Sequence, residues 1–343
     1  MKKEKRTELG EIGEFGLIDK IRKNVKIFNQ STIKGIGDDA AVIKYGNKLI
    51  LLSTDMLVEG IHFDMTFTPL KHLGYKAAVV NISDIAAMNG IPQQMTVSLA
   101  LSNRYSLEAI EELYEGIKSA CKNYKVDLVG GDITSSVSGL IISVAIVGTV
   151  EKQKISYRNS AKENDLVCVT GDLGGAYIGL QLLEREKQIF LKDKGMQPEL
   201  NEKDYVVKRQ LMPEARTDII YELKDLNIVP TSMIDISDGL ASELLHICYS
   251  SKVGAKIYED KLPIDNMTSE TAAELNLDPI TCTLNGGEDY ELLFTIKSSD
   301  FEKIKNHADI TIIGHITKSK SGINLVTKEG NIVEVIAQGW KHF

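Results

Sequence analysis

The length and composition of this chain limit the kinds of protein it can be. At 343 residues it is too long for one typical domain, and about 150 residues per domain predicts two. Apolar residues make up 43% and charged residues 26%, which is ordinary for a soluble globular protein with a hydrophobic core. The net charge is −8 and no basic patch stands out, which argues against nucleic acid as the main partner.

The cysteines and the apolar runs indicate a cellular compartment. Four cysteines lie far apart and form no CxxC pair, which favours buried thiols in a reducing cytoplasm over disulfides or zinc. The basic opening MKKEKR is followed by ELGEIGEFGLIDKI, whose four acidic residues do not suit a signal peptide. The longest apolar run, GLIISVAIVGTV, has 12 residues and is too short to cross a bilayer. We therefore predict a cytoplasmic protein with no membrane partner.

A hairpin with two adjacent carboxylates at its mouth is predicted near the start of the chain. Two short apolar runs flank the turn sequence YGN at residues 45–47. If the turn is centred on GN, Asp39 lies opposite Thr54 and Asp38 opposite Asp55. Like charges that face each other across a strand pair are destabilising. The alternatives are a solvated hairpin mouth, because exposed Asp is common, or a divalent cation between the carboxylates.

The remaining elements of the first half alternate between helix and strand. Helices are expected over residues 8–28, around Lys71–Met88 and over 107–124, and strands over 95–102, 127–132 and 140–150. This alternation is typical of an α/β or α+β fold. The polar stretch 151–164 is a plausible connector, so we predict two domains, 1–150 and 151–343.

The second half repeats the alternation. DLVCVTG is expected to be a strand that leads into the helix AYIGLQLLE, and TSMIDISDGLASELLHICYSS a strand, a sharp turn and a helix. CTLNGGEDYELLFTI is expected to be a loop that feeds a strand, followed by a small helix at Phe301–Ala308 and terminal strands. Residues 185–210 are polar with little periodicity and predict either an ordered helix pair or a mobile insertion.

Acidic residues recur beside Gly, Ser or Thr at five places, and we expect each to end an apolar strand. The segments are GIGDDA, STD (53–55), NISD (81–84), GGD (130–132) and DISD (235–238). Carboxylates from several strand ends, helped by hydroxyls, suit a cluster of divalent ions. Helix capping is the alternative for NISD and DISD, because Ser and Asp are preferred caps, but it leaves Asp235 unexplained.

Phosphate-binding loops of the common kinds are absent from the sequence. It contains no GxxxxGK[ST], no kinase HRD and DFG set and no GxGxxG. VTGDLGGAYIG is a weak candidate, because Gly174 and Gly175 can also serve close helix packing. If the protein binds a nucleotide, metal ions must therefore make more of the phosphate contact than a lysine-bearing loop does.

Eight segments, in chain order, resemble the thiamine-monophosphate kinase family along nearly the whole chain. They are GIGDDAA, STDMLVEGIHF, NISDIAAMNG, GGDIT, YRNSAKENDLVCVTGDLGGA, IDISDGLASEL, GGEDYELLF and the ending GWKHF. The GxGDD and SDG pieces also occur in a wider superfamily with aminoimidazole ribonucleotide synthetase, selenophosphate synthetase and a hydrogenase maturation protein. The resemblance implies a two-domain α/β (α+β) fold of the aminoimidazole ribonucleotide synthetase kind. Its N-terminal sheet domain would bind ATP and magnesium and form a homodimer, and its C-terminal α/β domain would complete both sites.

The resemblance also implies site residues at matching positions. The implied magnesium ligands are Asp39, Ser53, Thr54, Asp55, Asp84, Asp132, Asp235 and Asp238. The implied nucleotide contacts are Tyr114, Gly131, Asp132, Arg158 and Ser237, and the implied contacts to thiamine monophosphate are His62, Glu288 and Trp340. Asp38 belongs to the motif but is assigned no direct metal contact. A structural hydrogen bond for His62 and a packing role for Trp340 are the alternatives.

The implied reaction is ATP-dependent phosphorylation of thiamine monophosphate to thiamine diphosphate, the last step of thiamine diphosphate biosynthesis. A phosphomonoester has a second pKa of about 6, so the acceptor is mostly a dianion at neutral pH and needs no general base. No residue is therefore assigned a catalytic role; in-line transfer would depend on positioning and on several magnesium ions. Glu288 could orient the aminopyrimidine of the acceptor, and Trp340 could attract its thiazolium cation.

Two other functions remain open from the sequence. One is a superfamily relative that uses ATP to activate another substrate. Two such relatives are disfavoured because the first cysteine here is Cys121, whereas selenophosphate synthetases carry a reactive residue near the N-terminus, and because the chain ends in GWKHF rather than a functional cysteine. The other is a non-catalytic metal-binding or interaction protein, which predicts metal binding without turnover.

Overall fold

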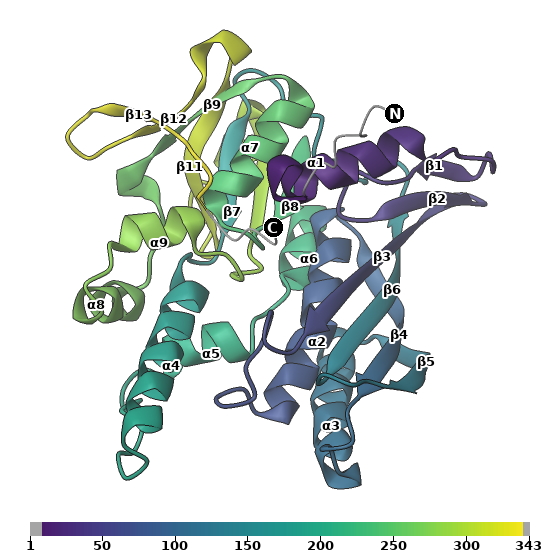
Figure 1. The fold of residues 1–343 in the computed structure, drawn as a ribbon. Helices are drawn as coiled ribbons and strands as arrows, with labels where there is room; N and C mark the ends of the chain where they lie inside the picture. Colours follow the sequence, from purple (N-terminus) through teal and green to yellow (C-terminus); the bar gives the residue numbers. More distant parts are fainter. Residues whose placement is uncertain (1–8, 339–343) are drawn as a thin grey trace, which may run out of the picture.

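Two sheets with flanking helices make up the computed structural model, which describes residues 9–338 (Figure 1). The first sheet has the order β1-β2-β3-β6-β4-β5 and the second β13-β12-β9-β11-β7-β10-β8. The first contains β1 (Thr32–Lys34), β2 (Ala41–Tyr45), β3 (Lys48–Val58), β4 (Ile91–Leu101), β5 (Asp127–Ser135) and β6 (Ile141–Glu151). The second contains β7 (Leu166–Thr170), β8 (Ser232–Asp235), β9 (Gly254–Tyr258), β10 (Leu292–Ile296), β11 (Ile310–Thr317), β12 (Ile323–Val326) and β13 (Ile332–Glu334). The predicted two-domain α/β architecture is confirmed.

Helices cover one face of the first sheet. These are α2 (Leu70–Ala87) and α3 (Leu107–Tyr124), and the sequence predicted the bounds of α3 correctly. They approach closely because both carry glycine at the contact: a Cβ at Gly74 would lie 1.9 Å from the backbone oxygen of Leu113. The buried residues of β3, β4 and β6 pack with them into one hydrophobic core. The first sheet is thus a two-layer unit with its helices on one side.

The second sheet is more deeply enclosed. Strands β7, β8 and β10 are buried at nearly every position, so side chains on both of their faces lie in apolar surroundings. Its pairs are antiparallel apart from β9 and β12. The helices of this half are α4 (Gly175–Lys192), α5 (Asp204–Leu211), α6 (Thr217–Asp225), α7 (Leu240–Ser251), α8 (Asn266–Glu274), α9 (Pro279–Asn285) and α10 (Phe301–Ile304).

The hairpin has the predicted register but a shorter ladder. Tyr45 pairs with Lys48 and the pairing continues to Ala41, as expected. Residues 35–40 lie in the turn before β2, so Asp38 does not face Asp55. Asp38 instead forms an ion pair with Lys34, whose Nζ lies 2.8 Å from Asp38 Oδ2. The expected repulsion between two opposed carboxylates is therefore absent.

The expectation that every acidic segment ends a strand is wrong. NISD lies inside α2, STD inside β3 and GGD inside β5, and GIGDDA precedes a strand; DISD alone follows one. The sequence KAAVVNIS looked partly strand-like because it contains apolar β-branched residues. It is helical because α2 is buried nearly all round between the first sheet, α3 and the second half of the chain.

Several boundaries differ from the predictions. Residues 185–210 contain the end of α4 and most of α5, so the ordered helix pair was the correct alternative. The segment CTLN belongs to α9 rather than to a loop, and Asp278 caps that helix through the backbone N–H of Thr281. The first helix, α1 (Leu9–Asn24), ends four residues earlier than expected and is interrupted at Gly13, where φ is 64°. It lies across the top of the first sheet, next to α7 (Figure 1).

Candidate functional site

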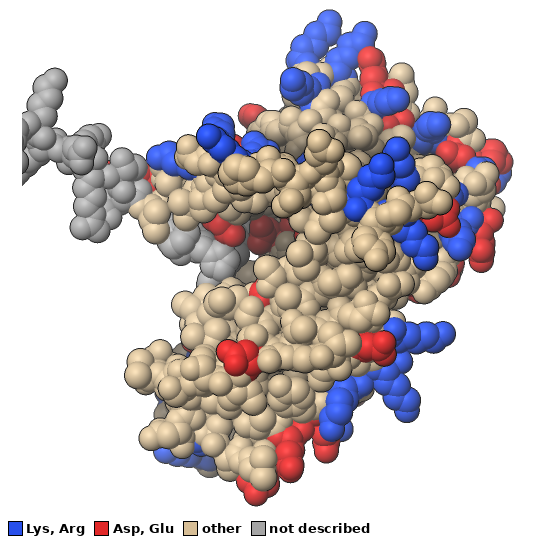
Figure 2. All heavy atoms as spheres, turned by 90° about the vertical axis from the view of Figure 1, so that its right-hand side faces the viewer, with Lys and Arg blue, Asp and Glu red and all other residues tan. Residues whose placement is uncertain are grey.

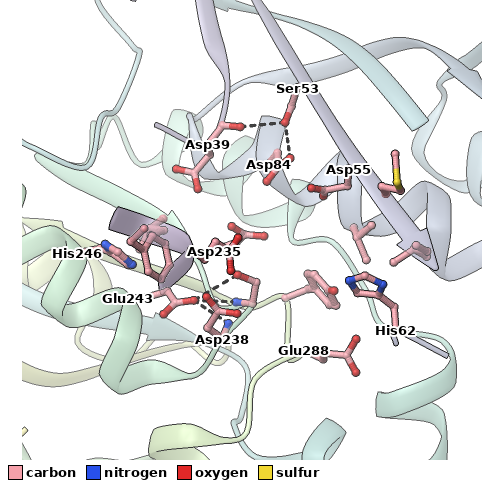
Figure 3. Close-up of a pocket in the computed structure, with 18 of the residues that line it drawn as sticks. Asp39, Ser53, Asp55, His62, Asp84, Asp235, Asp238, Glu243, His246 and Glu288 are labelled. Carbon is pink, nitrogen blue, oxygen red and sulfur yellow. Dashed lines mark hydrogen bonds between the residues drawn. The ribbon is translucent and has the colours of Figure 1, made fainter. Parts of the chain in front are cut away.

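A cleft of about 1990 Å³ lies between the two halves of the chain. Its walls come from α1, the turn before β2, β3, α2, the loop at 59–68, Arg158, α4 and the turn between β8 and α7. The close-up in Figure 3 shows acidic side chains from both halves facing this space. Since a typical small-molecule site occupies about 300–1,000 Å³, the cleft has room for more than one ligand.

Three carboxylates that are distant in sequence meet in this cleft. Oxygens of Asp39, Asp84 and Asp235 all lie within 4.8 Å of one another. Ser53 Oγ lies 2.9 Å from the backbone oxygen of Asp39 and 2.5 Å from Asp84 Oδ2, and Ser83 donates to Asp235 Oδ2 at 2.6 Å. Hard divalent cations prefer sets of oxygen ligands such as this one, so the residues fit a metal ion by their chemistry and spacing.

Burial and mutual repulsion raise the pKa values of Asp84, Asp235 and Asp55. The pKa of Asp84 is raised well above its usual value by burial and by the nearby charges of Asp55 and Asp235. Burial, with the neighbouring Asp39, raises the pKa of Asp235 to about 7 and also raises that of Asp55. A bound cation would reverse this cost, because it favours the ionised form of each carboxylate.

Arg158 brings a positive charge to the cluster from the predicted connector. Its Nε donates to Asp39 Oδ2 at 3.1 Å and its guanidinium also contacts Asp39 Oδ1. Its backbone N–H donates to Asp38 Oδ1 at 3.3 Å, on the side where Lys34 pairs with the same carboxylate. The stretch 151–164 is therefore a connector that also supplies a site residue.

His62 and Glu288 lie together at the other end of the cleft (Figure 3). The backbone N–H of Val58 donates to His62 Nδ1 at 3.0 Å, so Nδ1 is an acceptor and a neutral imidazole carries its proton on Nε2. Among the described residues, this is the structural hydrogen bond that the sequence allowed for His62. The His62 ring still lines the cleft when this hydrogen bond is made, so His62 can make the structural contact and also contact a ligand.

Three of the expected site residues lie away from the cleft. Gly131 and Asp132 are exposed on the edge strand β5, and Tyr114 packs against the N-terminal core. Three strand spacings separate β5 from β3, roughly 14 Å, so within one chain Asp132 does not join the other carboxylates. A Cβ at Gly131 would lie 1.9 Å from the backbone oxygen of Val97, which explains this glycine by strand packing.

The other expected residues are placed as follows. Ser53, Thr54, Asp55, Ser237 and Asp238 line the cleft. The Thr54 hydroxyl already donates to the backbone oxygen of Val144 at 2.8 Å. Trp340 lies outside the described residues, so the structure does not place it.

Comparison with known proteins assigns the chain that forms this site to a family. The profile of the AIR synthase related protein N-terminal domain matches residues 37–150, and that of the C-terminal domain matches residues 162–326. Thiamine-monophosphate kinase from Bacillus subtilis is 37% identical over 343 residues, covering 96% of this chain and 99% of that protein. The chain belongs to the thiamine-monophosphate kinase family.

Further relatives of the thiamine-monophosphate kinase family agree with this assignment. The enzyme from Aquifex aeolicus is 37% identical over 336 residues, covering 98% of this chain and 99% of the enzyme. The structure of AaThiL complexed with AMPPCP and TMP has a TM-score of 0.82 and 34% identity, and covers 99% of this chain and 100% of that one. Among the described residues, no helix has both the length and the apolar character needed to span a membrane.

One residue that the sequence analysis missed, Glu243, supports the turn between β8 and α7 in the wall of this cleft. Glu243 lies in the first turn of α7, and its Oε1 accepts the backbone N–H groups of Ser237 at 3.2 Å and Asp238 at 2.8 Å. The side chain reaches back over the helix start, as in a capping box. An acidic residue five positions after the SD pair was the sequence signal that could have indicated it. Burial and the charge of Asp238 raise the pKa of Glu243.

Proposed function

We propose that this chain transfers the γ-phosphoryl group of ATP to the phosphate of thiamine monophosphate. The observation that carries the proposal is the convergence of Asp39, Asp84 and Asp235 in one cleft. The family assignment supports the same reaction, since the AaThiL structure is complexed with AMPPCP and TMP. The size of the cleft and its two chemically different ends suit two ligands side by side.

Asp39, Asp84 and Asp235 would hold magnesium ions, with Asp55, Ser53 and Asp238 within the same cleft. Magnesium bound there would supply charge neutralisation for the phosphates of donor and acceptor. This matters because two like unit charges about 4 Å apart repel by roughly 4 kcal/mol at an effective dielectric of 20. A carboxylate cluster is therefore useful only with cations, and a phosphate would not enter it alone.

The chain's own residues would position the two substrates. Arg158 can offer a planar pair of N–H donors to a phosphate, the geometry it now uses on Asp39. Ser237 presents its hydroxyl at the start of α7, anchored by Glu243. No general base is needed because the acceptor phosphate is already a dianion. His62 Nε2 and Glu288 would contact the acceptor at the far end.

We propose further that the active form is a homodimer in which the partner supplies Asp132. The face of the first sheet opposite α2 and α3 has few charged residues (Figure 2) and exposes Leu52 and Met56. Asp132 shares a cross-strand row with Ser98, Ser143 and Met56, which places it on this face, and Met56 also lines the cleft. A second copy packed on this face would bring its own Asp132 toward the cleft.

The reaction is tested by incubating the purified protein with ATP, Mg²⁺ and thiamine monophosphate and separating the products by chromatography. We expect thiamine diphosphate and ADP in equal amounts, and none with the no-enzyme control. ATP hydrolysis without thiamine diphosphate would point to a superfamily relative with another substrate. Metal binding without any product would point to a non-catalytic protein.

The shared site is tested by mixing two inactive variants, Asp84→Asn and Asp132→Asn. A mixed dimer would contain one site with both native carboxylates, so exchange of subunits at equal amounts should restore about one quarter of the wild-type rate. If the mixture stays inactive although subunit exchange is demonstrated by mass spectrometry, Asp132 does not act in the partner's site.

A further inference from the structure

Glu288 is held in an unusual backbone conformation at the acceptor end of the cleft. Its φ is 59°, in the left-handed region that residues with a Cβ rarely adopt. Its backbone N–H donates to the backbone oxygen of Ser237 at 2.7 Å, which ties this loop to the turn after β8. The main chain therefore fixes the point at which the Glu288 side chain leaves the loop, and 27% of that side chain remains exposed at the cleft.

Two side chains clamp this carboxylate from different parts of the fold. Lys76 Nζ, on α2, lies 3.0 Å from Glu288 Oε1, and Gln210 Nε2, on α5, donates to Glu288 Oε2 at 2.8 Å. Lys76 Nζ also donates to the backbone oxygen of Gln210 at 3.0 Å, which closes a triangle of contacts. Lys76 is only 4% exposed, and lysine is almost never so buried without a charged partner.

The orientation of the Gln210 amide follows from its partner. An ionised carboxylate only accepts hydrogen bonds, so the atom facing Glu288 must be the amide nitrogen. Gln210 Oε1 is then buried with no hydrogen-bond partner among the described residues. Because the oxygen gains no bond in this position, the hydrogen bond that accounts for a glutamine here is the donation to Glu288.

We propose that Lys76 and Gln210 are positioning residues that set the specificity for the acceptor through Glu288. A carboxylate has about four acceptor positions, and the clamp uses one on each oxygen. The remaining positions face the cleft and require a ligand that donates, such as the exocyclic amine of an aminopyrimidine. A ligand that presents an oxygen acceptor there instead would be repelled. This inference rests on the proposed function, because it assumes thiamine monophosphate as the acceptor.

The main test uses Gln210→Met, which keeps a similar volume but removes both the donor and the unpartnered oxygen. We expect KM for thiamine monophosphate to rise roughly tenfold while KM for ATP stays within about twofold. The preference for thiamine monophosphate over its analogue with oxygen in place of the amine should fall by a similar factor. Because a buried oxygen without a partner is lost, the melting temperature should not fall. Unchanged specificity in the folded variant, or equal rises in both KM values, would overturn the proposal.

Lys76 is tested without leaving a buried charge unpaired. Lys76→Met alone leaves the Glu288 carboxylate without its charged partner, so we make it in the Glu288→Gln variant. If Lys76 acts through Glu288, the double variant should have the same KM for thiamine monophosphate as Glu288→Gln alone, and a further rise in that KM would overturn the role of Lys76. Lys71→Met is the matched control, because Lys71 lies on the same helix and pairs with Glu115 at 3.5 Å while more than half exposed. It should change neither KM value.

Calorimetric binding of thiamine monophosphate separates this inference from the proposed reaction. If the wild-type protein makes no thiamine diphosphate but binds the acceptor, and Gln210→Met weakens that binding, the clamp stands and the kinase assignment fails. If the wild type makes thiamine diphosphate but Gln210→Met binds thiamine monophosphate as tightly as the wild type does, the kinase assignment stands and the clamp fails. If the wild type shows neither turnover nor binding, both are overturned.

Discussion

The two interior strands β6 and β10 look alike in sequence and differ in the fold. Both are apolar, with IISVAIVGTV in one and LLFTI in the other. Along β6 every second residue is buried and the others are partly exposed, whereas every residue of β10 is buried. In the second sheet, β7, β8 and β10 are thus enclosed on both faces by their own chain, while the first sheet has helices on one face only. An apolar strand with one bare face indicates that a partner covers it, which supports the proposed homodimer.

The largest difference should come from matched apolar truncations in the two sheets. Phe294 in β10 is fully buried, so Phe294→Ala should lower the free energy of unfolding by about 3–5 kcal/mol. Met56 on the uncovered face of β3 is 55% exposed, so Met56→Ala should cost less than about 0.5 kcal/mol in the monomer. Urea unfolding at low protein concentration measures both. Equal losses would mean that the first sheet is as enclosed as the second.

Asp84 belongs to the acidic cluster, which lies on the side of the first sheet that α2 covers. Asp84→Asn tests whether that covered side, unlike the uncovered side, is needed for turnover. We expect turnover to fall at least about a hundredfold, roughly 2.7 kcal/mol in barrier, because a buried carboxylate that we propose as a magnesium ligand is lost. Removing one of several crowded buried charges should at the same time raise the free energy of unfolding. Steady-state kinetics measures the expected fall in turnover, and urea unfolding measures the expected rise in the free energy of unfolding. A variant that is both active and less stable would remove Asp84 from the cluster.

His246 lies where α1 contacts α7, and its titration should make the folding stability depend on pH. Its ring lies 4.4 Å from that of Phe15, and burial, with the charge of Arg158, lowers its pKa to about 4. A lowered histidine pKa means that the unfolded chain binds the proton first, so stability present above pH 6.5 is lost as pH falls toward 4. His246→Phe removes this dependence and should gain about 2 kcal/mol over the wild type between pH 7 and pH 5. Parallel pH profiles for the two proteins would contradict the assignment.

The smallest effect on the fold is expected when a charged residue is introduced on the face of the first sheet opposite α2 and α3. Ser143 lies in the middle of that face, beside Ser98 and Met56 on the neighbouring strands. Ser143→Arg should change the unfolding free energy of the monomer by less than about 0.5 kcal/mol. It should nevertheless shift the molar mass in solution from dimer to monomer. A dimer that persists at micromolar concentration would place the interface elsewhere.

Local patterns predicted the elements well where one face of the element decides its environment. The amphipathic helix at 107–124 and the hairpin register follow from spacing and turn residues, which act over a few positions. Predictions failed where burial on all sides overrode local preference. The helix expected around Lys71–Met88 is confirmed as α2, but NISD was also expected at a strand end and instead lies inside that helix, because packing on every side stabilises it in spite of its β-branched residues.

The amino-acid sequence by itself determined the family, the two-domain α/β architecture and the set of carboxylates that could bind cations, because these depend on residue types in a fixed order. The tertiary structure alone decided which of them meet. Asp84 and Asp235 are 151 positions apart and share one cleft, whereas Asp132 lies in a similar motif on an exposed edge strand. The clamp of Lys76 and Gln210 on Glu288 has no sequence signal, since distances between helices from different halves of a chain follow from packing and not from spacing along it.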